Sequence, residues 1–234
     1  MSLEAVQDTF IKFFHQRTCD RVVSADKMMV HARGPVWHRK PQEQGIIPKG
    51  LTGLDTEATW SYSKSDGWVY GHGTFCLVAC KNKMLGVFKW MRNSANEAKR
   101  MWLETGKLKG LITTVLMDSK ADDKDLFFEF RRQRQMVLLT TPRKGADKSL
   151  ARQRMIKVLK KPKNKRVYKQ RSYTVEPMQG LVKDIFELER CWMRGAVNNR
   201  WLFAAMGVVV QLHQYRAWEA GRSTWAIKQE VLGR

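Results

Sequence analysis

The order of the apolar segments limits the possible folds of this chain more than any other feature. Several strand-like segments come first, and helical and strand segments then alternate. Strands are predicted at 21–32, 59–63, 68–80, 84–91, 112–117 and 136–141, with helices at 94–108 and 125–134 between the later ones. Adjacent strands followed by alternating elements imply a mixed sheet flanked by helices, so we predict an α/β fold.

Helices are also expected at both ends of the chain. Residues 3–16 have apolar side chains at helical spacing, and Ser94 and Glu97 match a capping box that would start the helix at 94. Residues 33–58 show no clear helical or strand periodicity of apolar residues and are expected to form an insertion loop. The C-terminal part is predicted to be helical at 174–195, 199–214 and 217–234.

Charge indicates the class of partner. The 234 residues include 43 Lys and Arg against 22 Asp and Glu, a formal net charge of +21. Contacts to phosphates release counterions and dominate affinity for nucleic acids, so such a charge favours a polyanionic partner. The alternative is a basic protein with no specific target.

The segment 143–171 concentrates this charge. It holds thirteen Lys and Arg and one acidic residue, Asp147. A solvated linker is one reading, because blocks of like charge repel. Apolar residues such as Met155 and Leu159 favour the other reading, a basic surface helix or loop that lies on DNA.

Other classes of protein fit less well. The longest apolar run, 201–212, is too short to span a bilayer, and no secretory signal is evident at the N-terminus. Four cysteines are few for a disulfide scaffold and suit a reducing cytosol. His72, Cys76 and Cys80 lie on one face of a predicted strand, where core packing is a better explanation than zinc.

Three acidic residues lie at the edges of apolar elements. Asp26 interrupts a predicted strand, Asp118 ends another, and Glu176 starts a helix. If the strands are neighbours, the carboxylates can converge and hold Mg²⁺, which would relieve their repulsion. The residues alone also allow Asp118 to be a helix cap and Glu176 to favour a helix N-terminus. Asp55 remains an alternative first carboxylate.

Three strand motifs resemble those of a known family. SADKMMVHA at 24–32 and VLMD at 115–118 resemble the strands that carry the first and second Asp of DDE transposases from bacterial insertion sequences. WVYGH at 68–72 resembles the strand that follows the first Asp, with Gly71 where the family has Lys. This family has a ribonuclease H-like catalytic core.

The most specific similarity surrounds the third carboxylate. Tyr168, Arg171, Glu176 and Lys183 resemble the family's Tyr, Arg, Glu and Lys signature, although four residues rather than three separate Arg171 from Glu176. The resemblance implies a ribonuclease H-like domain over 20–215, after an N-terminal helix at 1–19 and before a helical tail at 216–234. The helix at 1–19 would be the remnant of a recognition region in a truncated copy.

The resemblance also implies roles for these residues. Asp26, Asp118 and Glu176 would hold two Mg²⁺ or Mn²⁺ ions, and Tyr168, Arg171 and Lys183 would position DNA phosphates. Basic residues of the charged segment would hold the transposon end: Arg143, Lys144, Lys148, Arg152, Lys160, Lys161, Lys163 and Lys165.

The implied reaction is hydrolytic nicking that releases a 3′-hydroxyl, followed by transfer of that end into target DNA. The implied setting is a bacterial cytoplasm, with the protein associated with the nucleoid and acting as a homo-oligomer on DNA. Two alternatives stay open: a non-catalytic basic DNA-binding protein, and a ribonuclease H-like nuclease without strand transfer.

Overall fold

The computed structural model describes residues 2–63, 66–143, 145 and 149–233. The strands are β1 (Val22–His31), β2 (Thr59–Ser63), β3 (Gly67–Ala79), β4 (Leu85–Arg92), β5 (Thr114–Leu116) and β6 (Val137–Leu139). The α-helices are α1 (Leu3–Thr18), α2 (Arg39–Glu43), α3 (Glu97–Gly106), α4 (Lys124–Arg134), α5 (Leu150–Lys160), α6 (Pro162–Lys169), α7 (Val175–Phe186), α8 (Ala196–Glu219) and α9 (Lys228–Val231). Two 3₁₀ helices are η1 (Ser119–Ala121) and η3 (Gln170–Tyr173).

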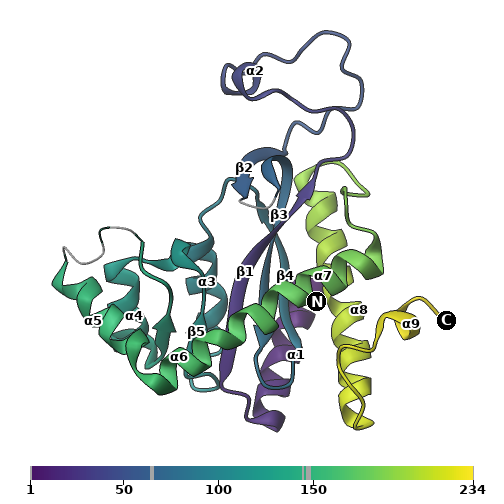
Figure 1. Cartoon of the computed structure of the whole chain (residues 1–234). Helices are drawn as coiled ribbons and strands as arrows, with labels where there is room; N and C mark the ends of the chain where they lie inside the picture. The colour runs from purple at the N-terminus through teal and green to yellow at the C-terminus, as the bar shows by residue number, and fades with distance from the viewer. Residues whose placement is uncertain (1, 64–65, 144, 146–148, 234) are drawn as a thin grey trace.

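The strands form one mixed, curled sheet (Figure 1). β3 pairs antiparallel with β1, β2 and β4, and β5 continues the sheet parallel to β1, with β6 parallel to β5. β2 and β4 pair with successive halves of the long strand β3. The predicted ribonuclease H-like mixed sheet flanked by helices is therefore confirmed.

Each face of the sheet is covered by helices. On one face, Val23 and Phe75 pack with Phe14 of α1, Met101 of α3 and Phe130 of α4. The other face packs against α7 and α8, as shown by the cluster that joins Met28, Cys76, Val182 and Phe203. Alternate residues of a strand point to opposite faces, so the sheet separates two apolar cores. None of the described helices combines the length and apolar character that a membrane crossing requires.

Buried glutamines form hydrogen bonds with the backbone groups on the open edge of β4. Gln7 of α1 accepts a hydrogen bond from the Phe88 backbone N–H (2.8 Å) and donates to the Phe88 carbonyl (3.1 Å). On α8, Gln211 donates to the Gly86 carbonyl and Gln214 accepts from the Leu85 N–H, both at 2.8 Å. An uncovered strand edge leaves unpaired backbone groups, so these amides replace a neighbouring strand.

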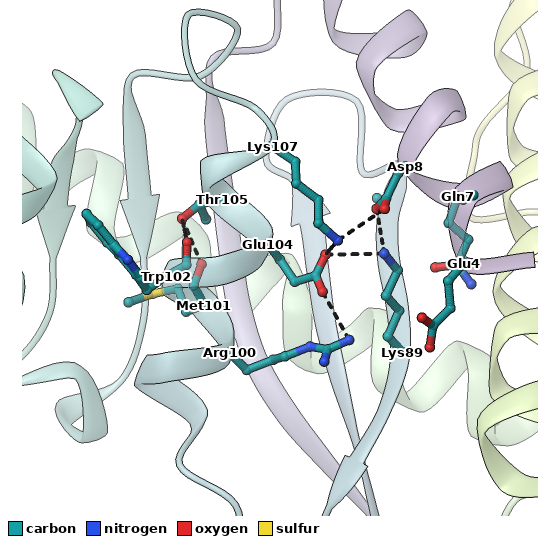
Figure 2. Close-up of polar contacts among 12 residues, drawn as sticks. Glu4, Gln7, Asp8, Lys89, Arg100, Met101, Trp102, Glu104, Thr105 and Lys107 are labelled. Atoms are coloured by element: carbon teal, nitrogen blue, oxygen red, sulfur yellow. Dashed lines mark hydrogen bonds and ion pairs between the residues drawn. The ribbon is translucent and has the colours of Figure 1, made fainter. Parts of the chain in front are cut away.

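A buried ionic cluster fastens α1 and α3 to β4 (Figure 2). The amino group of Lys89, whose side chain is 1% exposed, lies 2.5 Å from Asp8 and 3.2 Å from Glu104. Glu104 also pairs with Arg100 at 3.0 Å and with Lys107 at 2.7 Å. Burial lowers the pKa of Lys89, and both carboxylates oppose this by stabilising its charged form. The stability of this buried cluster therefore depends on every charged partner being present.

Several element boundaries differ from the predictions. The helix that was expected to run from 174 to 195 ends at Phe186, because Glu187 takes a left-handed conformation with φ of 49°. Helix α8 contains the helix predicted at 199–214 and continues to Glu219, since nothing between 214 and 217 breaks a helix. The helix predicted at 217–234 is wrong beyond Glu219, where the chain turns before the short helix α9. Helix α3 begins at Glu97 rather than at 94, because the Asn96 side chain accepts from the N–H groups of Ala98 and Lys99.

The predicted insertion at 33–58 extends beyond one end of the sheet and contains the short helix α2 (Figure 1). The predicted turn between β2 and β3 includes Ser65, which lies outside the described residues.

The Glu104→Gln variant tests the ionic cluster. Neutralising Glu104 removes the anion shared by Lys89, Arg100 and Lys107. We expect the free energy of unfolding to fall by about 3 kcal/mol, because the buried Lys89 ammonium loses one of its two carboxylate partners. Urea denaturation measures this change. Glu43→Gln, which breaks an exposed pair with Arg39, is the control and is expected to cost less than about 0.5 kcal/mol. Equal effects of the two variants would contradict the structural role of the cluster.

Candidate active site

One of the predicted carboxylates, Asp26, lies on β1, and a second, Asp118, lies two residues after the end of the adjacent parallel strand β5. Ser24 of β1 is the register partner of Leu116 of β5, and Asp26 and Asp118 each follow two residues later. The pKa of Asp26 responds to the charge of Asp118, as expected for neighbouring groups. Asp118 also caps η1, because its Oδ1 accepts a hydrogen bond of 2.9 Å from the Lys120 backbone N–H. The sheet therefore brings the two aspartates together.

Arg171 connects the third predicted carboxylate to this pair. Its guanidinium donates from Nη2 to Asp26 Oδ2 at 2.9 Å and from Nη1 to Glu176 Oε1 at 2.7 Å. Arg171 lies on η3, directly before α7, and Glu176 lies in the first turn of α7. Glu176 is half exposed, whereas Asp26 and Arg171 are mostly buried. Asp26 and Glu176 thus face each other across one guanidinium.

The environment of Asp26 disfavours its charged form. Burial raises the pKa of Asp26 from 3.8 to about 6; Arg171 opposes this shift, while Asp118 and Glu97 add to it. Cys76, the register partner of Asp26 on β3, is fully buried, and the pKa of its thiol is raised by burial and then by Asp26. The site therefore concentrates negative charge that Arg171 offsets only in part.

The sequence did not predict three charged residues that adjoin the aspartates. Glu97 of α3 is 5% exposed, and its Oε1 lies 3.1 Å from the Lys27 amino group and 2.6 Å from that of Lys120. Lys27 directly follows Asp26, and Lys120 lies two residues after Asp118. In the sequence Glu97 appeared only as part of a capping box and Lys120 as part of a turn, so no local signal distinguished them.

The basic helices α5 and α6 lead directly into the site. Their apolar side packs on the sheet, where Val158, Leu159 and Val167 meet Leu116 and Leu139. Exposed cations cover the outer side: Arg154, Lys157, Lys160, Lys161, Lys163, Lys165, Arg166 and Lys169. The part of the predicted segment that the structure describes from 149 onward is therefore largely helical.

Three other residues predicted to contact DNA form bonds within the protein. Arg143 donates to the carbonyls of Ser119 and Lys120, and Arg152 pairs with the carboxylate of Asp122. Tyr168 donates its hydroxyl to the Met117 carbonyl at 3.2 Å, next to Asp118. Lys144 and Lys148 lie outside the described residues.

Lys183 lies in the last turn of α7, two turns after Glu176. Its charge lowers the pKa of the Cys76 thiol, although burial has the larger, opposite effect. Lys183 therefore lies near the part of β3 that is paired with Asp26.

Asp55 belongs to a separate buried cluster. Its Oδ2 lies 2.9 Å from His72 Nε2 and accepts a hydrogen bond from the Gly195 N–H at 3.0 Å. The Trp90 indole N–H donates to His72 Nδ1 at 3.0 Å, so the remaining proton of a neutral imidazole lies on Nε2, toward Asp55. These bonds fasten the insertion to the sheet and to the start of α8. Asp55 makes none of the contacts that join Asp26 to Glu176.

The acidic residues fit a hard cation in charge and in chemistry. Asp26 and Asp118 offer carboxylate oxygens, the ligands that Mg²⁺ and Mn²⁺ prefer. As the side chains stand, the described residues include no group of three or more His, Cys, Asp or Glu arranged around a metal position. The reason is visible in the contacts, because Arg171 takes the place between Asp26 and Glu176. The chain thus supplies its own cation to this acidic site.

No protein-family model and no curated protein matches the chain. The fold is similar to a piggyBac transposase in a synaptic complex with hairpin DNA, at 8% identity and a TM-score of 0.49, over 90% of this chain and 51% of that one. It is also similar to the Mos1 mariner paired end complex with Mn (9% identity, TM-score 0.29, 94% and 62% covered) and to a pre-cleavage Mos1 transpososome (9%, 0.26, 97% and 62%).

The chain thus spans about half of the piggyBac chain and 62% of the Mos1 chains. Because all three TM-scores lie below 0.5, the function proposed below rests on the geometry of the site.

The Asp26→Asn variant tests the electrostatics of the site. A carboxylate whose folded pKa is raised to about 6 destabilises the folded state as pH rises from 4 through 6. Without divalent ions, we expect Asp26→Asn to raise the free energy of unfolding at pH 7.5 by about 1–3 kcal/mol and to have little effect at pH 4. Denaturation at both pH values measures this difference. Asp184→Asn, at an exposed position, is the control. A gain of equal size at both pH values would show that Asp26 is not electrostatically strained.

Proposed function

We propose that this protein is a DDE-type DNA transposase of a bacterial insertion sequence, which cuts and joins DNA strands with the help of Mg²⁺ or Mn²⁺. The observation that carries the proposal is the placement of Asp26 on β1 and of Asp118 two residues after the end of the adjacent parallel strand β5, with Glu176 joined to Asp26 through Arg171. The charge of Asp118 contributes to the raised pKa of Asp26, and a binding site for cations is a physical reason to retain neighbouring carboxylates.

The proposed reaction depends on positioning and on neutralising charge. Divalent cations held by Asp26, Asp118 and Glu176 would activate water and stabilise the departing oxygen of a phosphodiester. Asp26 on β1 and Asp118 just after β5 would supply metal ligands from the centre of the sheet. Glu176, the third ligand, is half exposed at the start of α7. Arg171 would release the carboxylates and contact a phosphate, since guanidinium groups bind both kinds of anion.

The basic helices supply a path for DNA toward this site. Lys160, Lys161, Lys163 and Lys165 are exposed, and α6 continues through η3 to Arg171 and Glu176. Phosphate contacts along this surface would hold the transposon end, with Tyr168 close to Asp118 and Lys183 on α7. A homo-oligomer on DNA, with transposon ends and target as partners, belongs to the same proposal.

A second candidate is a basic DNA-binding protein without catalysis. Asp118 caps η1, and both Asp26 and Glu176 pair with Arg171, which are structural roles that need no metal. In this case the basic helices would bind DNA and divalent ions would have no specific effect. A nuclease without strand transfer is a third candidate, distinguished by the absence of strand-transfer products on transposon-end DNA.

The Asp118→Asn variant tests the enzymatic proposal. An asparagine oxygen can still cap η1, so the fold should persist. We expect Mg²⁺-dependent cleavage of transposon-end DNA to fall at least about 100-fold, because one metal ligand loses its charge. Salt-sensitive DNA binding should be unchanged. Asp184→Asn on α7 serves as the control and should cleave normally. Full cleavage by Asp118→Asn would remove Asp118 from the site.

A triple substitution tests the DNA path. Replacing Lys160, Lys161 and Lys163 with Ala should reduce the slope of log affinity against log salt by about 2–3, because each phosphate contact contributes about 0.9. Fluorescence anisotropy over a salt series measures the slope. The matched control replaces Lys40, Lys49 and Lys228, which are exposed on other elements. Identical slopes for the two triple variants would contradict a DNA contact by α5 and α6.

A further inference from the structure

Glu97 and its two lysines lie on the face of the sheet opposite Arg171. Met28 faces the core formed with α7, and Asp26 points to the same side because it lies two residues earlier on β1. Lys27 points to the other side, where it meets Glu97 of α3. Arg171 therefore approaches the aspartates from the α7 side, and the Glu97 cluster adjoins them from the α3 side.

Lys27 already compensates Glu97. Besides its contact with Glu97, the Lys27 amino group donates to Ser61 Oγ at 3.1 Å and to the Asn93 carbonyl at 2.7 Å. These three acceptors use all three N–H groups of the ammonium. The Lys27 side chain is 4% exposed, so the pair is an internal structural bond.

Lys120 is the second lysine and differs from Lys27 in two respects. Its side chain is 44% exposed, and in the part of the chain that the structure describes its amino group has one recorded partner, Glu97 at 2.6 Å. N–H groups of the ammonium therefore remain for a ligand. Lys120 also lines a recess of about 540 Å³ beside α3 and α4, together with acidic residues that include Asp122 and Asp125.

The charge on Lys120 is held next to the aspartates. Its backbone N–H binds Asp118, which fixes where its side chain starts. Asp118 and Asp26 are close enough to act electrostatically on the Lys120 amino group. Glu97 holds that amino group at 2.6 Å and so determines where it sits.

We propose that Lys120 binds a phosphate of the nucleic acid strand that passes Asp26 and Asp118, and that Glu97 is a positioning residue that holds Lys120 there. This inference rests on the proposed function, since it names a further contact to the same DNA. The two faces of the sheet would then each supply one cation, Arg171 and Lys120, on either side of the aspartate pair.

Lys120→Met tests the proposal, because methionine keeps the apolar stem and removes the charge. The probe is duplex DNA of the terminal inverted repeat, in which methylphosphonates neutralise one phosphate at a time. We expect the wild type to lose on the order of 10-fold in affinity at one position near the cleavage site, as for a charged hydrogen bond. Lys120→Met should bind unmodified DNA about as weakly as the wild type binds DNA neutralised at that phosphate. Neutralising the same phosphate should then cause no further loss of affinity for Lys120→Met.

Lys124→Met, at an exposed position on α4, is the matched control and should keep the full methylphosphonate effect. Lys120→Arg should restore the effect, and Glu97→Gln should weaken it at the same phosphate only. Thermal melts establish that each variant is folded. If Lys120→Met responds to every methylphosphonate as Lys124→Met does, the proposal is wrong.

The outcomes for this inference and for the proposed function are separable, because binding is measured without cleavage. Cleavage that requires Asp118, together with no coupling at Lys120, would overturn the phosphate contact and keep the enzyme. Coupling at Lys120 in a protein that cleaves no DNA would keep the contact and overturn the enzymatic proposal.

Discussion

The repulsion between Asp26 and Asp118 is the constraint on which the site depends. Parallel pairing of β1 and β5 sets the two carboxylates side by side, and burial removes the water that would screen them. The Arg171 guanidinium offsets this charge and draws Glu176 toward the pair. Because negative charge remains in excess, additional positive charge stabilises the site, whether it comes from a divalent ion or from a lysine such as Lys120.

The surrounding fold prevents the aspartates from moving apart. β1, which carries Asp26, and β5, which ends two residues before Asp118, are central in the sheet, with β3 on one side and β6 on the other. Beyond β3, the free edge of β4 is closed by Gln7, Gln211 and Gln214, and the Lys89 cluster fastens α1 and α3 over it (Figure 2). Glu176 lies in the first turn of α7, whose apolar side packs in the core, whereas Arg171 lies on the short 3₁₀ helix η3 that precedes it.

The sequence was sufficient to predict the sheet and the neighbouring aspartates, because strand periodicity and an acidic residue at a strand end are local signals. Glu176 was a candidate from its place at a predicted helix start, whereas Arg171 was identified through a family resemblance. The contacts of Arg171 with Asp26 and with Glu176 require the tertiary fold. Glu97 and Lys120 could not be predicted, because a helix start on α3 meets a turn after β5 only once the sheet has formed. Helix ends were misplaced where a cap such as Asn96 or a left-handed residue such as Glu187 decides them.

Crystals soaked in Mn²⁺ offer the most direct test of the central claim, that the acidic residues hold divalent cations. Anomalous scattering identifies the ion without relying on activity. We predict a Mn²⁺ peak bonded to carboxylate oxygens of Asp26 and Asp118, with the Arg171 guanidinium moved away from Asp26. If Arg171 still bridges Asp26 and Glu176 at saturating Mn²⁺ and no peak lies beside the aspartates, the metal-dependent account is contradicted.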